Sequence, residues 1–237
     1  MRAEEPQQLY LSTTGIIAAV TGAPAPSSSA SDELEFRGVI DDPDGYANLR
    51  SRPNARSAII AEVKKGERFT FERKTFLNEK TREVEYDPWC RVKLASGKRG
   101  WMEAQSIVLF FTKDDLPGEP EKGDEIASEA REHGIDYYQT TQGAVRGDVE
   151  ALKTFFRVGE FADGQAGEEY DENFRIVVHL IGDDALAAFL RSQPLSVQIT
   201  MRNYIGENVT RPFRSTEYLQ RHFPKTAKIL FRRELTD

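Results

Sequence analysis

The spacing of apolar residues changes abruptly along this chain, and the change limits the folds open to it. Between residues 36 and 111, short runs alternate apolar and polar positions, the period of a strand with one buried face. Between residues 149 and 190, apolar residues recur every three or four positions, as in an amphipathic helix. Residues 114–123, with two prolines, two glycines and several charges, separate the two patterns. The sequence therefore predicts an α+β protein with two domains.

The expected boundaries follow from these patterns. We expect a strand-rich domain over residues 36–112, a linker over 113–123 and a helical domain over 124–237. Residues 1–35 hold an Ala-Pro and serine-rich stretch that cannot pack and is typical of a disordered tail. A truncated or degenerate secretory signal is the alternative interpretation, because a short apolar run precedes that stretch. The alternative would place the protein in the periplasm, in the envelope or outside the cell, and a disordered tail would also suit a cytoplasmic protein.

Composition argues against several classes of function. The chain has 237 residues, one cysteine and three histidines, and none of the histidines has metal-ligand spacing. No apolar run reaches the roughly 18 residues that a membrane span needs. No cysteine, serine or threonine has a general base within predicted reach, so we expect no catalytic residue. The sequence thus predicts a protein that is not an enzyme and that uses no cofactor or metal.

Charge is unevenly distributed along the chain. The net charge is −7 overall, but residues 36–113 carry +5, residues 114–210 carry −12 and residues 211–237 carry +4. Such alternation indicates either a basic region that meets an anionic partner or oppositely charged regions that face each other within the molecule. A nucleic-acid partner is not expected, since the basic excess is small and lacks a run of lysine and arginine interleaved with aromatics.

One strand is predicted in enough detail to place its side chains. Alternation from Trp89 to Leu94 directs Cys90, Val92 and Leu94 to one face, and Trp89, Arg91 and Lys93 to the other. We therefore expect Cys90 to be an inert thiol in the core and Trp89 to lie on the outer face. Five or six short strands within about 75 residues predict a small barrel.

Four short elements in this half resemble the bacterial SH3 family. They are the Leu49-Arg50-Ser51-Arg52-Pro53 stretch, the Lys65-Gly66 turn, the Trp89-Cys90-Arg91-Val92 strand and the Gly100-Trp101 pair, in the order found in that family. The resemblance covers about 75 of the 237 residues and implies an SH3-like barrel of five or six strands. It also implies a targeting module for cell-wall peptidoglycan or peptides. The segment from Glu72 to Asp87 is longer than the family's usual hairpin and holds nine charged residues, so we expect it to project into solvent or onto a partner.

The helical half contains a weak internal repeat. A Gly-Asp pair precedes apolar residues at helical spacing both at Gly147-Asp148 and, 35 residues later, at Gly182-Asp183. Glycine suits the end of one helix and aspartate caps the next, so the pairs predict helix boundaries. We therefore expect a compact helical bundle with features of helical repeats. Its sequence resembles no family that we recognise.

The three histidines have ordinary structural interpretations. His133 precedes a glycine at a predicted helix end, where a cation suits the helix dipole. His179 lies beside the apolar stripe of a helix and is expected to be half-buried and hydrogen-bonded. His222 lies in a basic stretch and is expected to be solvated.

Candidate ligand-binding residues lie in the predicted barrel. An extended peptide can lie across aromatic rings and form hydrogen bonds at loops. The candidates are Tyr46, Asn48, Arg50, Tyr86, Trp89 and Trp101. Two of them have competing interpretations, since Trp101 is expected to pack inside the barrel and Arg50 to brace its own loop.

The leading hypothesis is a non-catalytic binding protein. Its SH3-like module would recognise a cell-wall peptide or another envelope partner, and its helical domain would act as a scaffold. The alternative is an intracellular structural or regulatory protein whose barrel docks on its own helices. A hydrolase with its active site in the helical half is a third and weaker hypothesis.

Overall fold

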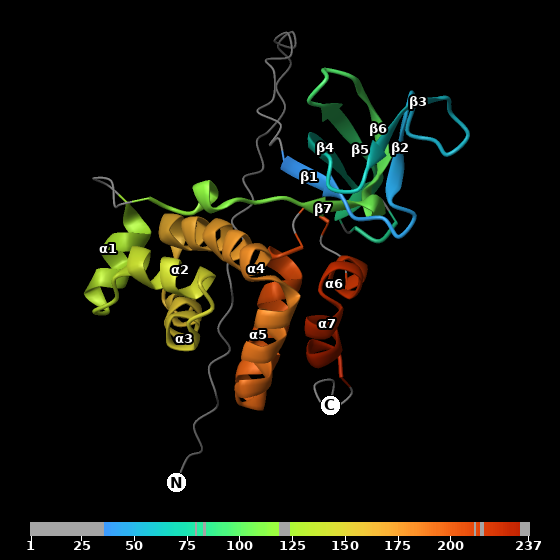
Figure 1. Ribbon diagram of the computed structural model, residues 1–237. Coiled ribbons are helices and arrows are strands. Elements are labelled where there is room, and N and C mark those ends of the chain that lie inside the picture. The colour runs from blue at the N-terminus through green and yellow to red at the C-terminus, as the bar shows by residue number, and fades with distance from the viewer. Residues whose placement is uncertain are drawn as a thin grey trace, which may run out of the picture. The chain divides into compact units, whose positions relative to one another are not determined.

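A strand-rich region is followed along the chain by a helical region (Figure 1). The computed structural model describes residues 36–78, 80–82, 84–118, 124–210, 212–213 and 216–232, so the expected tail over residues 1–35 lies outside the described residues. Within these ranges, seven strands form one antiparallel sheet in the order β3-β2-β6-β5-β4-β1-β7. They are β1 (Phe36–Ile40), β2 (Tyr46–Arg50), β3 (Ile59–Lys64), β4 (Arg68–Leu77), β5 (Val84–Leu94), β6 (Arg99–Glu103) and β7 (Ile107–Leu109). The sheet curls on itself, as expected of an SH3-like barrel, with one or two strands more than predicted.

The inner face of the sheet confirms the alternation predicted for β5. Cys90, Val92 and Leu94 are buried, whereas Arg91 and Lys93 are exposed. Burial raises the pKa of the Cys90 thiol to about 12, so the thiol stays protonated at neutral pH and is inert.

Trp101 does not occupy the core position expected for it. Gly100 and Met102 point inward, and Trp101 is half-buried on the outer face. The reason is the close approach of β2, because a Cβ on Gly100 would lie 2.6 Å from the Arg50 carbonyl oxygen. Only glycine fits there, so alternation gives the next inward position to Met102 and turns the tryptophan outward.

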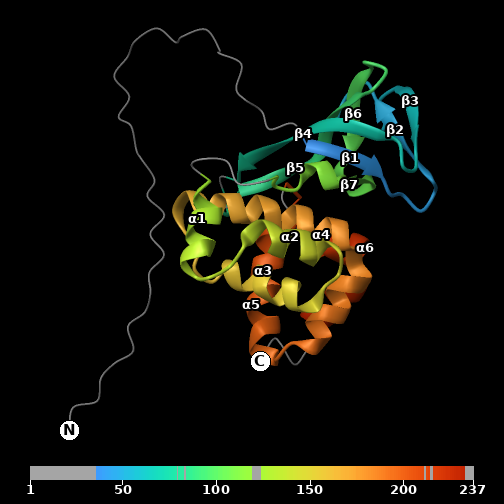
Figure 2. The same ribbon diagram turned by 60° about the vertical axis from the view of Figure 1, so that its left-hand side comes forward.

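The helical region contains seven helices within the described residues. They are α1 (Glu125–Glu132), α2 (Tyr137–Val145), α3 (Val149–Val158), α4 (Gly164–Ser192), α5 (Leu195–Asn208), α6 (Thr216–His222) and α7 (Pro224–Leu230). Helix α4 packs against α1, α2, α3, α5 and α7 and forms the centre of this region (Figure 2). Two short 3-10 helices, η1 (Ala104–Ser106) and η2 (Lys113–Asp115), flank β7.

Both Gly-Asp pairs lie at helix boundaries, as predicted. Asp148 accepts hydrogen bonds from the amides of Glu150 and Ala151, and Gly147 has a φ of 83°. Gly182, with φ 74° and ψ 176°, kinks α4 into two helical segments. Asp183 does not cap its own segment, however. Its carboxylate accepts hydrogen bonds from the amides of Lys225 and Thr226 at the start of α7.

Buried side chains of the strand-rich and helical regions form one continuous cluster. The Phe213 ring, which precedes α6, stacks on Phe71 of β4 with 5.8 Å between ring centroids. The Tyr218 hydroxyl of α6 accepts a hydrogen bond from the Leu109 amide of β7 at 3.1 Å. The boundaries of the two expected domains stay a prediction. Among the described residues, no helix is both long and apolar enough to cross a membrane.

Candidate functional site

The outer face of the sheet carries most of the predicted binding residues. Strand register places Arg50, Trp101, Arg91 and Glu72 directly opposite one another on β2, β6, β5 and β4. We call these four residues the Trp101 row. One step further along β5 and β6, Trp89 lies opposite Glu103. Alternation therefore places both tryptophans on the same outer face, about 7 Å apart along the strands.

Trp89 forms one wall of a groove between the sheet and α6. The groove has a volume of about 440 Å³, and Trp89 itself is partly exposed, as predicted. We call this hollow the Trp89 groove. It is lined by Arg73, Pro88, Trp89, Glu103, Ala104, Gln105, Phe213, Glu217, Tyr218, Arg221 and His222.

Arg73 lines the Trp89 groove and is held in place by several hydrogen bonds. Its Nε donates to the Asp87 carbonyl at 2.8 Å, and its Nη1 donates to the carbonyls of Pro212 and Phe213 at 3.3 and 3.2 Å. The guanidinium also lies 5.2 Å from the ring centroids of both Tyr86 and Phe213. Tyr86 thus acts through Arg73, by a cation–π contact, and does not itself line the groove.

His222 is not solvated, contrary to the sequence prediction. Its side chain is only 3% exposed, and its Nδ1 lies 3.1 Å from the Asp41 carboxylate. Burial lowers the pKa of His222, while Asp41 opposes that shift. The basic stretch is amphipathic, because α6 buries His222 and Tyr218 against the barrel and leaves Arg221 exposed beside Asp42.

His179 is half-buried and hydrogen-bonded, as predicted. Its Nδ1 lies 2.8 Å from the Arg175 carbonyl, which can only accept, so Nδ1 carries the proton. Its Nε2 therefore accepts from the Tyr218 hydroxyl at 3.0 Å, and the oxygen of that hydroxyl accepts from the Leu109 amide. Burial lowers the pKa of His179 to about 4. The imidazole is neutral at pH 7 and joins α4, α6 and β7.

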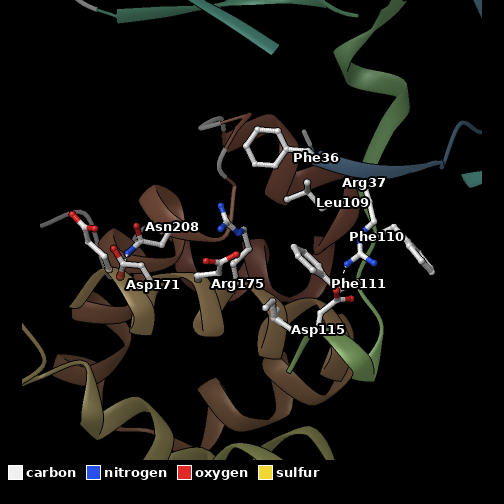
Figure 3. Close-up of a pocket in the computed structure, with 12 residues that line it drawn as sticks. Phe36, Arg37, Leu109, Phe110, Phe111, Asp115, Asp171, Arg175 and Asn208 are labelled. Carbon is white, nitrogen blue, oxygen red and sulfur yellow. Dashed lines mark hydrogen bonds and ion pairs between the residues drawn. The ribbon is translucent and has the colours of Figure 1, made fainter. Parts of the chain in front are cut away.

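A second hollow, of about 600 Å³, lies where β1 and the segment after β7 approach α4 (Figure 3). Arg37 forms an ion pair with Asp115 on one side of it. On the other side, the Asp171 carboxylate accepts hydrogen bonds from the Tyr204 hydroxyl and from Asn208. Two of the carboxylates that line this hollow, Asp115 and Asp171, are therefore already bound by other side chains. Among the lining residues, no nucleophile is paired with a base.

This geometry can be compared with known families. Residues 45–108 match the family model of the bacterial SH3 domain. The match confirms the resemblance and spans β2 to β6 and the first two residues of β7, whereas β1 lies outside it and the helical region has no family match. No curated protein matches the chain. Bacterial SH3 domains are binding modules, generally for cell-wall components or proteins.

The bacterial SH3 segment does not gather all six predicted residues into one site. Tyr46 is exposed and Asn48 is half-buried on β2, which is separated from β5 by β6. Arg50 braces its own loop, since its Nη1 donates to the Ser57 carbonyl at 2.9 Å. Of the six predicted residues, only Trp89 is among the described residues that line the Trp89 groove.

Sequence reasoning missed the part of the groove that lies outside the bacterial SH3 segment. Phe213, Glu217 and Tyr218 come from the chain around the start of α6, more than 100 residues after Trp89. The apolar spacing of Phe213, Tyr218, Leu219 and Phe223 was a signal that α6 has a buried face. Nothing in that spacing indicated that the buried face would meet the barrel.

Proposed function

We propose that this protein is a non-catalytic binding protein whose bacterial SH3 segment holds a peptide in the Trp89 groove. The proposed peptide comes from the cell wall or from another envelope partner, and the helical region acts as the scaffold that completes the groove. The observation that carries the proposal is the position of Trp89, which is partly exposed on the outer face and forms one wall of a hollow. Partly exposed aromatic anchors of this kind contribute much of the affinity at peptide sites.

The chemistry of the groove supports a peptide that carries both an amine and a carboxylate. Trp89, Phe213 and Tyr218 supply apolar ring surface. Glu103 and Glu217 supply negative charge, and Arg221 supplies positive charge. Short peptides with free amino and carboxyl groups match the mixed charge of these lining residues, whereas a purely apolar ligand would not use it.

Co-sedimentation with purified cell wall tests the proposal. The full chain should sediment with intact wall, and Trp89→Ala should weaken the binding about 30-fold, as expected for an anchor worth about 2 kcal/mol. Phe231→Ala is the control, because it removes a partly exposed aromatic ring at the end of α7 that does not line the groove. Equal binding by Trp89→Ala and the wild type would contradict the proposal, and wall stripped of its peptides should bind neither.

The contacts of α6 support a second candidate function, in which the barrel serves structure or regulation by docking on its own helices. Phe213, Tyr218 and His222 are all buried against the barrel side of the groove. Under this alternative the wild-type chain would not sediment with cell wall at all. The sedimentation experiment therefore separates the two functions.

A further inference from the structure

A second row of side chains crosses the outer face of the sheet, and it is almost entirely basic. Strand register places Arg99 of β6 opposite Lys93 of β5, Lys93 opposite Thr70 of β4, and Thr70 opposite Arg37 of β1. Arg99, Lys93 and Arg37 are exposed. We call these four residues the basic row. It lies on the side of the Trp101 row away from Trp89, about 13 Å along the strands from the Trp89–Glu103 pair.

A hollow of about 560 Å³ opens beside the basic row. Arg37, Arg68 and Lys93 line it, together with the side chains of Thr70 and Thr112. Arg68 is exposed and lies over the Phe110 ring, 4.2 Å from its centroid. The hollow is therefore lined by three cations and two threonines, and a guanidinium already covers the Phe110 ring beside them.

The fold leaves most of this positive charge unneutralised. Arg37 forms an ion pair with Asp115, and Asp114 also lines the hollow. Within the described ranges, no carboxylate forms an ion pair with Arg68, Lys93 or Arg99. Like charges directly opposite each other on neighbouring strands destabilise a sheet, so the Lys93–Arg99 pair costs stability in the isolated protein. A bound anion would offset that cost.

We propose that the basic row and the hollow beside it form a docking surface for an extended acidic peptide segment of a partner protein. Charge complementarity argues for an anionic occupant, and three of the four cations on this surface, Arg37, Arg68 and Arg99, are arginines whose forked guanidinium groups fit carboxylates. Neighbouring strands lie about 4.8 Å apart, so Arg99 and Lys93 are about 5 Å apart across the sheet, and Lys93 and Arg37 are about 10 Å apart. These spacings lie on either side of the roughly 7 Å repeat of alternate side chains in an extended peptide. A single-stranded nucleic acid fits less well, because its bases need open aromatic faces and Phe110 is covered by Arg68.

Fluorescence anisotropy of the full-length protein tests the proposal with a labelled glutamate-serine repeat peptide as the probe. The wild type should bind the peptide at low salt, and Lys93→Glu combined with Arg99→Glu should weaken binding about tenfold or more, because attraction becomes repulsion at two positions. Lys228→Glu is the control for total charge when it is compared with Lys93→Glu alone, because each changes the net charge by −2. Lys228 is an exposed lysine of α7, is remote from the surface in sequence and has no ion-pair partner within the described residues. It should change the affinity less than about twofold if the surface is specific.

A lysine-serine repeat peptide and a single-stranded oligonucleotide of equal charge complete the experiment. The lysine-serine peptide should not bind. The proposal is overturned if the double variant binds the acidic peptide as the wild type does, if Lys228→Glu weakens binding equally, or if the oligonucleotide binds more tightly than the peptide. Lys93→Ala should weaken binding without lowering the melting temperature, because it relieves a like-charge pair, so loss of binding would not reflect unfolding. Trp89→Ala should leave this binding unchanged, which separates the surface from the Trp89 groove.

Discussion

At the scale of single residues, neighbouring positions on β6 respond differently to the same substitution. Met102 is buried in the barrel, whereas Trp101 is half-buried outside it. We expect Met102→Ala to lower the free energy of unfolding by about 2–5 kcal/mol, because it removes buried methylene groups and leaves a cavity. Trp101→Ala should cost less than Met102→Ala despite the larger side chain it removes. Urea unfolding of the two variants measures both effects, and the reverse order would contradict the outward placement of Trp101.

His179 should make stability depend on pH. Its pKa is about 4 in the folded protein because burial disfavours the charged imidazolium, against about 6.5 in an unfolded chain. The unfolded state therefore binds a proton first, and stability falls as pH decreases from about 6.5 towards 4, by roughly 2–3 kcal/mol.

The comparison variant for this pH dependence is His179→Gln, which keeps a hydrogen-bonding side chain but does not titrate. Unfolding free energies measured at pH 7 and pH 4.5 should differ less for His179→Gln than for the wild type. Identical losses in both proteins would show that His179 is not buried in its neutral form.

At the scale of elements, glycine has opposite roles in α4 and α5. Gly182 has φ 74° and ψ 176°, a conformation that other residues avoid, and a Cβ there would meet no atom within 4 Å. Gly182→Ala should therefore destabilise the protein by about 1–3 kcal/mol through backbone strain alone.

Gly206, within α5, provides the matched substitution. A Cβ on Gly206 would also meet no atom within 4 Å, and its φ is not in the positive region. Gly206→Ala should stabilise the protein by about 0.5–1 kcal/mol, because alanine favours the helix. Thermal unfolding of the pair should give melting temperatures that shift in opposite directions, and equal shifts would argue against the kink.

At the scale of the whole molecule, the ion pairs of the barrel follow the charge of the long segments only in part, as in the pair between Arg37 and Asp115. The sequence sets a basic barrel against the acidic residues 114–210, but Asp41 and Asp42 of the barrel face His222 and Arg221 of the basic C-terminal segment. The rings of Phe71, Phe213 and Tyr218 are buried at this contact, whereas both of its ion pairs include a partly exposed side chain, and exposed ion pairs contribute little. We therefore expect only weak salt dependence of the contact.

The continuous buried cluster predicts that barrel and helices unfold together. Both tryptophans, Trp89 and Trp101, lie in the barrel, so their fluorescence reports barrel unfolding, whereas circular dichroism at helical wavelengths reports mainly α1–α7. In urea, the two signals should follow one coincident transition. Separate midpoints would show instead that the two regions are independent domains.

Much of the barrel could be predicted from the sequence, because the face on which a strand residue lies depends on residues next to it in the chain. Alternation alone placed Cys90, Val92 and Leu94 inside and Trp89 outside, and the Gly147-Asp148 pair marked a helix boundary through short-range capping. Trp101 was misplaced because its orientation depends on how closely β2 approaches Gly100, a contact between residues 50 positions apart.

The two hydrophobic periods, the bacterial SH3 segment and the faces of its strands follow from the sequence alone, since each depends on neighbours within a few residues. Which surfaces meet depends instead on the tertiary structure. Helix α6 completes the Trp89 groove and buries His222 because its apolar face had to be covered by some apolar surface. Hydrophobic burial is not directional, so the pattern of α6 required a partner without specifying the barrel. Strand pairing likewise brought Arg99, Lys93 and Arg37 into one row, although 62 residues separate the first from the last.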